Sequence, residues 1–558
     1  MSNLTSRRDF LRLLGVSGLL TFTGGVLSAC GAQTGQKGVP AAPGAGAGAG
    51  GASTPVDLEI AIKSVQTEVP IFTGKPTRVW TYQAQVLKGD AASVQALPDT
   101  YLGPAIRVRK GQRVRVQYTN ELPGNAEQSI IHWHGLHLPE RMDGHPRDAI
   151  APGKTYTYEF QVTDRAGTYW FHPHPHERTA AQVYMGLAGL FIVTDEEEAA
   201  AGLPAGAYDV PLILQDRSFD KDNQLAYISD PMGSGMTQIM MGFLGERIVV
   251  NGKADFTLPV ATRVYRLRLL NGSNSRIYKL GWADGTPLTV VGTDGGLLEK
   301  PVQKKYVTLA PGERIELWAD FSGRKVGDEL TLRSLEFSGA EGAAAGGSGN
   351  MGGMSGSGMN MGGMSMGAAA GQAPALGAPL TVLKVRVERQ EPETLKLPAR
   401  LSQLNFNRVY DAVNRDNPRS FALTMRNMVW KINDRTFEMD GVTEGETVKL
   451  NTTELWEFVN QTNPGEMTDP MGMAHPFHIH GLQFQVVDRR VMPELAAGWE
   501  SVREGYVEEG WKDTFLLMPG ERVKVLLRFA DHTGMFVYHC HNLEHESAGM
   551  MRNYRVTA

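Results

Sequence analysis

Two copies of one sequence pattern decide the fold: residues 167–174 read GTYWFHPH and residues 534–541 read GMFVYHCH. Each copy follows a Pro-Gly turn, at Pro152 and at Pro519, and in both the proline precedes the first histidine by 20 residues. A third opening of this kind, APGERIEL at residues 310–317, has no His-x-His after it. The chain is therefore predicted to be an array of three related domains, with metal-type residues only in the outer two copies.

Short alternating stretches bounded by Gly or Pro predict β-structure in these copies. Examples are residues 107–109, 113–118, 155–160 and 523–527. Short strands at this spacing favour antiparallel Greek-key β-sandwiches. We predict an all-β chain of three such domains, at residues 55–200, 205–390 and 395–558.

Length, charge and cysteine content set broad limits on the protein. At 558 residues the chain is long enough for about three or four domains. Its formal net charge of -5, from 55 basic and 60 acidic residues, provides no basic field, so we expect no nucleic-acid partner. The two cysteines, Cys30 and Cys540, each have another explanation given below, and we expect no disulfide between them.

The first 30 residues have the pattern of an export signal. Twin arginines, Arg7 and Arg8, precede an apolar stretch over residues 13–26 that is short for a membrane-spanning helix. The stretch ends in LSAC at residues 27–30, which resembles a lipoprotein box in which Cys30 is lipidated; the alternative is an ordinary signal with a chance cysteine. We expect a twin-arginine lipoprotein-type signal and an exported, lipid-anchored protein, periplasmic or on the extracytoplasmic face of the membrane.

Two stretches are too rich in small residues to build a core. Residues 31–54 are rich in Gly, Ala and Pro and predict a flexible tether. Residues 338–375, at the end of the second predicted domain, hold six methionines among Gly and Ser, and we expect this insert to be disordered. The six are Met351, Met354, Met359, Met361, Met364 and Met366.

Ten of the 14 histidines fall in four clusters. The clusters are HWHG at 132–135, HPH at 172–174, HPFHIHG at 475–481, and HCH at 539–541 with a histidine four residues later. A strand places residues i and i+2 on one face, so each His-x-His pair presents two imidazoles side by side, and neutral imidazole is the commonest metal ligand. One pair alone is more often a polar surface pair, but four pairs in two repeated domains predict a metal site.

Cys540 discriminates among the metals. A thiolate with two imidazoles and a weak thioether is the ligand set of a blue-copper electron-transfer site and not of structural zinc. Cys540, His545 and Met550 lie close together in the sequence, and His475 comes from the partner segment. Met551 is an alternative axial ligand, but the spacing from His545 favours Met550.

The order and spacing of the four clusters resemble those of the three-domain multicopper oxidases, the laccases and bacterial cuprous oxidases, from about residue 60 to the end of the chain. The resemblance implies cupredoxin-like domains, four copper ions, and one-electron oxidation of a donor coupled to reduction of O2 to water. It places the type 1 copper on His475, Cys540, His545 and Met550. It places the type 2 copper on His132 and His478, and the type 3 pair on His134, His172, His174, His480, His539 and His541.

Reducing O2 to water consumes protons, so acids are expected near the cluster. Asp143 and Glu546 match positions where this family places proton-relay carboxylates. The alternative for each is an ordinary carboxylate that lies on the surface or only supports a metal ligand. The histidines outside the ligand pattern are interpreted as bystanders, and these are His137, His145, His176 and His532.

The methionine insert is the main indication of the donor, because soft thioethers select Cu(I) over harder cations. It is similar to the Met-rich segment of periplasmic copper-efflux oxidases, which implies Cu(I) oxidation and a role in copper tolerance. We expect the protein to be a monomer. Met471 and Met473, with Asp469, are predicted to complete a Cu(I) entry site beside the type 1 copper. The alternative is a laccase that oxidises a small phenol or aryl amine, with the insert as a linker.

Three other classes of protein fit parts of this pattern. A non-enzymatic copper storage or delivery protein needs Met and His clusters but no complete oxygen-reducing set. A structural cell-division protein of this fold would lack the ligands, and a two-domain nitrite reductase would have no metal-free middle repeat. All twelve ligand positions are filled here, which favours the oxidase.

Overall fold

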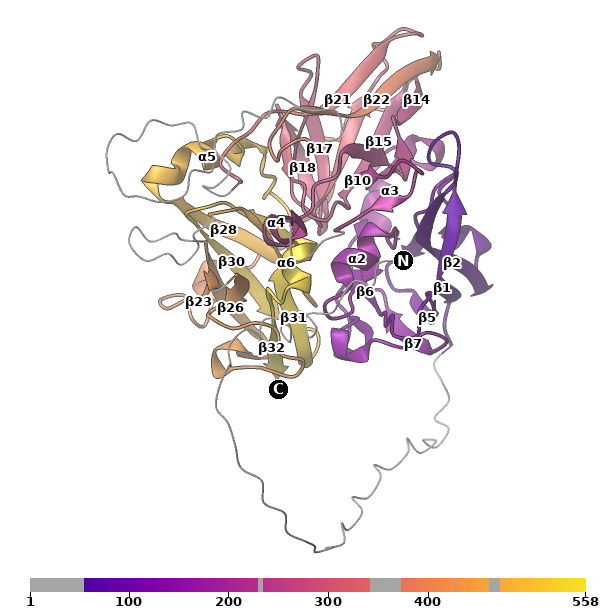
Figure 1. Ribbon diagram of the computed structural model, residues 1–558. Helices are drawn as coiled ribbons and strands as arrows, with labels where there is room; N and C mark the ends of the chain where they lie inside the picture. The colour runs from indigo at the N-terminus through magenta and orange to yellow at the C-terminus, as the bar shows by residue number, and fades with distance from the viewer. Residues whose placement is uncertain (1–54, 229–233, 342–372, 427, 461–471) are drawn as a thin grey trace, which may run out of the picture. The chain divides into compact units, whose positions relative to one another are not determined.

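The computed structural model describes residues 55–228, 234–341, 373–426, 428–460 and 472–558 (Figure 1). The chain divides into two compact units, residues 1–56 and residues 57–558, and the second holds every element named below. The predicted signal with Cys30, the tether, the six methionines of the insert, Asp469 and Met471 all lie outside the described residues. In the described part of the chain, no helix has both the length and the apolar character needed to cross a membrane.

Residues 58–194 form two sheets, here called the first sandwich, with strand orders β2-β1-β5-β7 and β3-β4-β9-β8-β6. Alternate residues of β5 are buried, because one face of the strand packs on the core between the sheets. The strands are β1 (Leu58–Val69), β2 (Thr77–Lys88), β3 (Val94–Gln95), β4 (Ala105–Arg109), β5 (Arg113–Glu121), β6 (Ile131–His134), β7 (Thr155–Gln161), β8 (Gly167–Pro173) and β9 (Gly189–Thr194). Helix α2 (Thr179–Tyr184) lies between β8 and β9 in the sequence, and α3 (Glu196–Ala201) follows β9.

Residues 209–389 form the middle sandwich, from an eight-stranded sheet and the five-stranded sheet β14-β22-β21-β16-β19. Helix α4 (Ser234–Met241) leaves this sandwich and lies beside α6 of the third one (Figure 1). The strands are β10 (Asp209–Phe219), β11 (Leu225–Ala226), β12 (Arg247–Val250), β13 (Lys253–Ala254), β14 (Thr257–Ala261), β15 (Val264–Asn271), β16 (Tyr278–Trp282), β17 (Leu288–Thr293), β18 (Gly296–Lys304), β19 (Val307–Leu309), β20 (Arg314–Asp320), β21 (Glu329–Ser334) and β22 (Leu380–Arg389).

Residues 419–557 form the third sandwich, from the sheets β24-β23-β26-β30-β28 and β25-β32-β31-β27-β29. Its core is rich in aromatic residues and also contains the one described cysteine, Cys540. The elements are β23 (Arg419–Arg426), β24 (Val429–Ile432), β25 (Thr447–Lys449), β26 (Thr452–Asn460), β27 (His475–Ile479), β28 (Phe484–Val491), α5 (Ala496–Glu500), β29 (Thr514–Leu517), β30 (Glu521–Phe529), β31 (Gly534–Cys540), α6 (Leu543–Ser547) and β32 (Met551–Thr557).

The predicted all-β fold is confirmed, and the four stretches predicted to be strands lie in β4, β5, β7 and β30. Most strand pairs are antiparallel, as predicted, but each of the six described sheets also contains one parallel pair. A chain that crosses between the two sheets of a sandwich returns to the first sheet in the same direction, which makes neighbouring strands parallel. The parallel pairs are β1–β5, β4–β9, β10–β15, β14–β22, β23–β26 and β25–β32. The positions of the domain boundaries stay a prediction.

The first described residues of the predicted methionine insert are part of the core. Ala340 is 2% exposed and packs in an apolar cluster with Ala474. The amide of Ala474 donates a hydrogen bond of 3.0 Å to the Ala340 carbonyl. Composition alone placed Ala340 in a low-complexity segment, because a backbone hydrogen bond to a distant strand leaves no mark on local composition.

Candidate metal centres

A cysteine and two histidines from three elements meet in the core of the third sandwich. Cys540 ends β31, His475 begins β27 and His545 lies in α6, and all three are buried. The Sγ atom of Cys540 lies 3.5 Å from His475 Nδ1 and 3.7 Å from His545 Nδ1, and the two Nδ1 atoms are 3.3 Å apart. One thiol and two imidazoles this close together can hold a single metal ion.

Backbone hydrogen bonds bring Met550 to the same place. The Cys540 amide donates to the Met550 carbonyl at 3.1 Å, and the Met550 amide donates to the His545 carbonyl at 2.9 Å. Met550 is buried in the same apolar cluster as Cys540, whereas Met551 packs in a separate cluster. Neighbouring residues of an extended chain point to opposite faces, so the two thioethers are separated. The structure therefore brings Met550, and not Met551, to the cysteine.

Helix α4 of the middle sandwich covers the edge of this group. The Met240 carbonyl accepts hydrogen bonds from His545 Nε2 at 2.9 Å and from Trp430 Nε1 at 3.2 Å. The ring of Trp430 packs on His475 and His545, with centroids 4.8 Å and 4.6 Å away. Because a carbonyl can only accept, the His545 proton is on Nε2, which leaves Nδ1 free to bind a metal beside Cys540.

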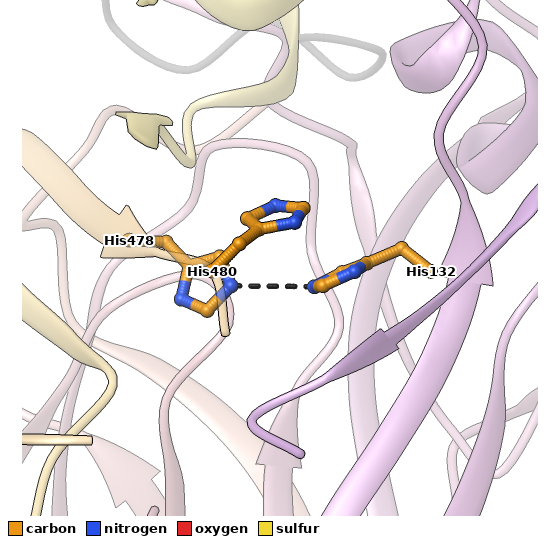
Figure 2. A group of neighbouring side chains, drawn as sticks. All are labelled: His132, His478 and His480. Carbon is orange, nitrogen blue, oxygen red and sulfur yellow. Dashed lines mark hydrogen bonds between the residues drawn. The ribbon is translucent and has the colours of Figure 1, made fainter. Parts of the chain in front are cut away.

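Eight histidines meet where the first sandwich faces the third. The register pairs β6 with β8 and β27 with β31, so each sandwich presents its histidines on two neighbouring strands or directly after them. Figure 2 shows His132 from the first sandwich beside His478 and His480 from the third, with Nε2 of His132 and Nε2 of His478 3.3 Å apart. The eight are His132, His134, His172, His174, His478, His480, His539 and His541, and all are buried.

Ring contacts divide these histidines into smaller groups. The Nε2 atom of His539 lies 3.3 Å from Nε2 of His174 and 3.1 Å from Nε2 of His480. The rings of His134 and His478 stack with centroids 3.7 Å apart, and the His541 ring lies 5.1 Å from that of His134. Several overlapping sets of three ligand atoms result, so the interface has room for more than one metal ion.

Backbone carbonyls fix the protons of four of these rings. The Nδ1 atoms of His132, His172, His478 and His539 lie 2.7, 3.0, 2.8 and 3.1 Å from carbonyl oxygens. Each Nδ1 therefore carries the proton, and each Nε2 keeps its lone pair. Burial lowers the pKa of all eight histidines, and for most of them the neighbouring histidines lower it further. The imidazoles are therefore neutral, and neutral imidazole is the form that binds metals.

Unpaired nitrogens at this interface fit a set of bound metal ions. Within the described chain, several buried ring nitrogens have no hydrogen-bond partner: His134 Nδ1, His172 Nε2, His174 Nδ1 and both nitrogens of His541. Leaving a buried polar atom unpaired costs about 1–3 kcal/mol. Imidazole nitrogens here, with one thiol and one thioether nearby, form a donor set suited to copper.

Both carboxylates predicted to relay protons reach the histidine cluster. Oδ2 of Asp143 accepts a hydrogen bond from His480 Nδ1 at 2.8 Å. The two carboxylate oxygens of Glu546 lie 3.3 Å from His539 Nδ1 and 3.5 Å from His174 Nε2. Burial raises the pKa of Asp143 well above its usual range and that of Glu546 to about 8. Neither is a surface residue, and the raised pKa of each favours the protonated carboxyl group in the metal-free chain.

The histidines outside the ligand pattern have other partners. His137 Nδ1 lies 2.6 Å from a carboxylate oxygen of Asp164. His145 is buried, and its Nε2 donates to Asn553 Oδ1 at 2.9 Å, so it ties the first sandwich to the third. His176 and His532 are half-buried.

Asp513 is a residue of this interface that sequence reasoning missed. Its Oδ1 lies 3.0 Å from His134 Nε2, and its carbonyl accepts the hydrogen bond from His478 Nδ1. It comes just before β29, which pairs with β27. A lone carboxylate outside any His-x-His pattern carries no local signal, and its role becomes visible only when the strands are paired.

We expect the metal-free protein to lose stability as the pH falls below about 6.5. Burial lowers the pKa of His172, His478 and His545 from 6.5 to about 3, so the unfolded chain binds these protons first. Stability from these groups is complete above pH 6.5 and is lost between pH 6.5 and about 3, at about 1.4 kcal/mol per pH unit for each histidine. Urea unfolding across this range measures it, and a flat profile would contradict it.

Comparisons with known proteins agree with this geometry. Sequence models described as multicopper oxidase match residues 78–198 and 412–558. A laccase from Bacillus subtilis (strain 168) is 29% identical over 528 residues, which cover 86% of this chain and 91% of the laccase. The crystal structure of the McoA multicopper oxidase from the hyperthermophile Aquifex aeolicus matches with a TM-score of 0.71 and 32% identity, over 90% of this chain and 97% of that one.

One relative of another kind matches part of the chain. The cell division protein FtsP of Escherichia coli (strain K12) is 36% identical over 288 residues, which cover 51% of this chain and 57% of FtsP. The laccase and the multicopper oxidase named above match over most of both chains, whereas FtsP matches about half of each.

Proposed function

This chain belongs to the multicopper oxidase family, and on that premise we propose that it is an exported oxidase that takes electrons from Cu(I). It is an oxidoreductase that uses four copper ions, one of type 1, one of type 2 and a type 3 pair. When bound, the copper ions accept single electrons from a donor and reduce O2 to water.

We assign the copper ligands by the contacts described above. The thiol of Cys540 and the Nδ1 atoms of His475 and His545 support a type 1 site, with Met550 beside them. The short contact between His132 and His478 supports a type 2 site. The two type 3 coppers are assigned to His134, His172 and His541, and to His174, His480 and His539.

Cys540 connects the two metal groups through the backbone. Its side chain lies in the core of the third sandwich, while His539 and His541 on either side lie in the histidine cluster. Alternation along a strand produces this arrangement, since adjacent residues point to opposite faces. A path of a few covalent bonds therefore joins the donor side to the oxygen side.

The two buried carboxyl groups support a role as donors of the protons that oxygen reduction consumes. Asp143 accepts a hydrogen bond from His480. Glu546 lies close to two other histidines of the cluster, His174 and His539. Carboxyl groups in contact with the metal-binding histidines can act as general acids, directly or through one water molecule.

The observation that supports Cu(I) as the donor is the group of methionines in the apolar cluster that contains Cys540. Met240 and Met473 are buried in the apolar cluster that contains Cys540, and Met236 and Met241 pack against it. The Met240 carbonyl occupies His545 Nε2, so a bulky aromatic donor has no direct approach to that edge of the ring. Soft thioethers bind Cu(I) in preference to harder cations, which fits a cuprous donor and a role in copper tolerance.

The first residues of the methionine insert lie in the same region. Ala340 bonds to Ala474, the residue before His475, so the chain enters the insert beside the type 1 group. A laccase acting on phenols or aryl amines is the second candidate, favoured by the Bacillus subtilis relative named a laccase.

Deleting residues 342–372 is expected to lower Cu(I) turnover by about tenfold or more, the range that loss of supporting groups around a metal produces, and to leave phenol turnover unchanged or raised. The deletion keeps Ala340 and its hydrogen bond in the core. Steady-state O2 consumption with Cu(I) and with 2,6-dimethoxyphenol measures both activities. The matched control retains the insert with its six methionines replaced by leucine, and it should lose Cu(I) turnover as the deletion does. Equal Cu(I) turnover in wild type and both variants would favour the laccase instead.

We further propose that the protein is a monomer, exported through the twin-arginine signal and anchored by a lipid on Cys30. The support is the sequence pattern of residues 1–30 and the tether that follows it. Membrane fractionation of the wild type against Cys30→Ala tests the anchor, and an equal distribution of the two would reject it.

A further inference from the structure

The middle sandwich holds none of the assigned copper ligands, yet its copy of the Pro-Gly loop contacts the histidine cluster. Residues 310–314, APGER, connect β19 to β20. A Cβ atom at Gly312 would lie 3.1 Å from the ring of His541, and Gly312 has a φ of +87°. Glycine is needed both for this left-handed backbone and for the close approach. The loop therefore packs directly on a copper ligand of the third sandwich.

Arg314, at the end of this loop, uses all its N–H donors in a buried position. Nη1 and Nη2 donate to the two carboxylate oxygens of Asp513 at 2.7 Å and 2.5 Å. The other hydrogen bonds run from Nε to the Thr168 carbonyl at 2.9 Å, from Nη1 to the Gly312 carbonyl at 2.9 Å, and from Nη2 to the Asp294 carbonyl at 3.0 Å. These acceptors come from all three sandwiches. A guanidinium group held in this way has one orientation and presents a fixed fork to the carboxylate.

Asp513 connects Arg314 to a copper ligand, His134. Its Oδ1 lies 3.0 Å from His134 Nε2, while His134 Nδ1 is buried and has no hydrogen-bond partner in the described chain. The proton is therefore on Nε2, and the lone pair of Nδ1 faces the cluster. A carboxylate on the far nitrogen fixes both the tautomer and the direction of a metal-binding imidazole.

The backbone after His134 is shaped around the same ion pair. A Cβ atom at Gly135 would lie 2.4 Å from Asp513 Oδ2 and 2.8 Å from Arg314 Nη2, and Gly135 has a φ of +92°. The chain that carries His134 thus passes closely over the Arg314–Asp513 pair, and a side chain at residue 135 would collide with both partners.

We propose that Arg314 is a positioning residue for the three-copper cluster, because it holds the Asp513 carboxylate on His134 and so fixes the direction of His134 Nδ1. This inference rests on the proposed ligand assignment. It gives the metal-free middle sandwich a part in the copper site: Arg314 sets the geometry of a ligand that belongs to the first sandwich, through a carboxylate that belongs to the third.

If the Arg314–Asp513 ion pair only joined the sandwiches, substituting Arg314 would lower stability without changing the copper site. Arg266 of β15 provides the comparison, because it too is buried and pairs with the buried Glu316, while reaching Glu198 near the first sandwich. Its described ion pairs involve no copper ligand. Lysine at either position keeps the positive charge but cannot form the two-pronged contact with a carboxylate. The variants Arg314→Lys and Arg266→Lys therefore perturb a buried ion pair to a similar degree, and only the first lies at the cluster.

The test compares copper-loaded wild type with these two variants. Copper affinity of the cluster is measured by competition with a chelator, the type 2 copper by electron paramagnetic resonance, the type 3 pair by its near-ultraviolet band, and the type 1 copper by its visible band. For Arg314→Lys we expect cluster affinity to fall about 10–100-fold, with an altered type 2 signal and an unchanged visible band. For Arg266→Lys we expect all four to match the wild type, although both variants unfold at a lower temperature.

Unchanged cluster affinity and an unchanged type 2 signal in Arg314→Lys would overturn the proposal. If that variant also loses the visible band, it has not folded, and Asp513→Asn, which keeps the volume of the side chain, decides the question. Asp513→Asn is expected to weaken the cluster in the same way, and a wild-type cluster in it would reject the proposal. A wild-type protein that binds no type 2 copper would instead reject the ligand assignment.

Discussion

The Cys540→Ser variant is expected to lose its visible absorption band, to bind one copper ion fewer per chain, and to turn over at least about 100-fold more slowly. Changes to groups that only support a metal ligand already cost 10–100-fold in affinity or activity, so loss of the thiolate itself costs more. Serine offers a hard oxygen where the site has a soft sulfur, and Cys540 is also the start of the covalent path to His539 and His541.

Copper content, visible absorption and O2 consumption measure this result together. Met550→Leu is the matched control, because it removes a weak axial ligand from the same buried cluster and leaves Cys540, His475 and His545 in place. That control should keep its copper and its visible band. A Cys540→Ser protein that retained both the band and O2 consumption would contradict the type 1 assignment.

The Glu546→Gln variant is expected to consume O2 about 10²–10⁴-fold more slowly, which is the usual contribution of a positioned general acid. Its copper content should be unchanged, because glutamine has the same shape and Glu546 is not an assigned ligand. Glu544→Gln is the matched control: Glu544 is also buried in α6, but it bonds to Tyr227, Asn274 and the amide of Phe243. Equal turnover in the two variants would contradict a role for Glu546 as a proton donor.

The pKa of Glu546 predicts the direction in which turnover changes with pH. Burial raises the pKa of Glu546 to about 8 in the metal-free chain, and bound copper cations lower it from there. The carboxyl group carries its proton below that pKa and loses it as the pH rises. Turnover by the wild type should therefore fall as the pH rises toward about 8, and the Glu546→Gln variant should lack that fall.

Local sequence patterns were enough to predict most of the fold and most of the residues in the metal groups. The period-2 alternation of a strand places both histidines of a His-x-His pair on one face, and Cys540 between His539 and His541 on the other. These relations need only the neighbouring residues and the strand conformation. The expected contact of Asp143 and Glu546 with the cluster came from the family resemblance, and the structure places both there.

Tertiary structure alone decided how the groups are supported and covered. Trp430 and the Met240 carbonyl meet at His545 from different sandwiches, and Arg314 reaches His134 through Asp513 across all three. Each of these contacts joins residues far apart in the sequence, and a single Trp, Asp or Arg has no spacing that identifies its partner. The sequence by itself determined which residues can bind copper, because that depends on side-chain chemistry and local period. Which residues orient those ligands depends on the packing of one sandwich on another, and only the folded chain determines that.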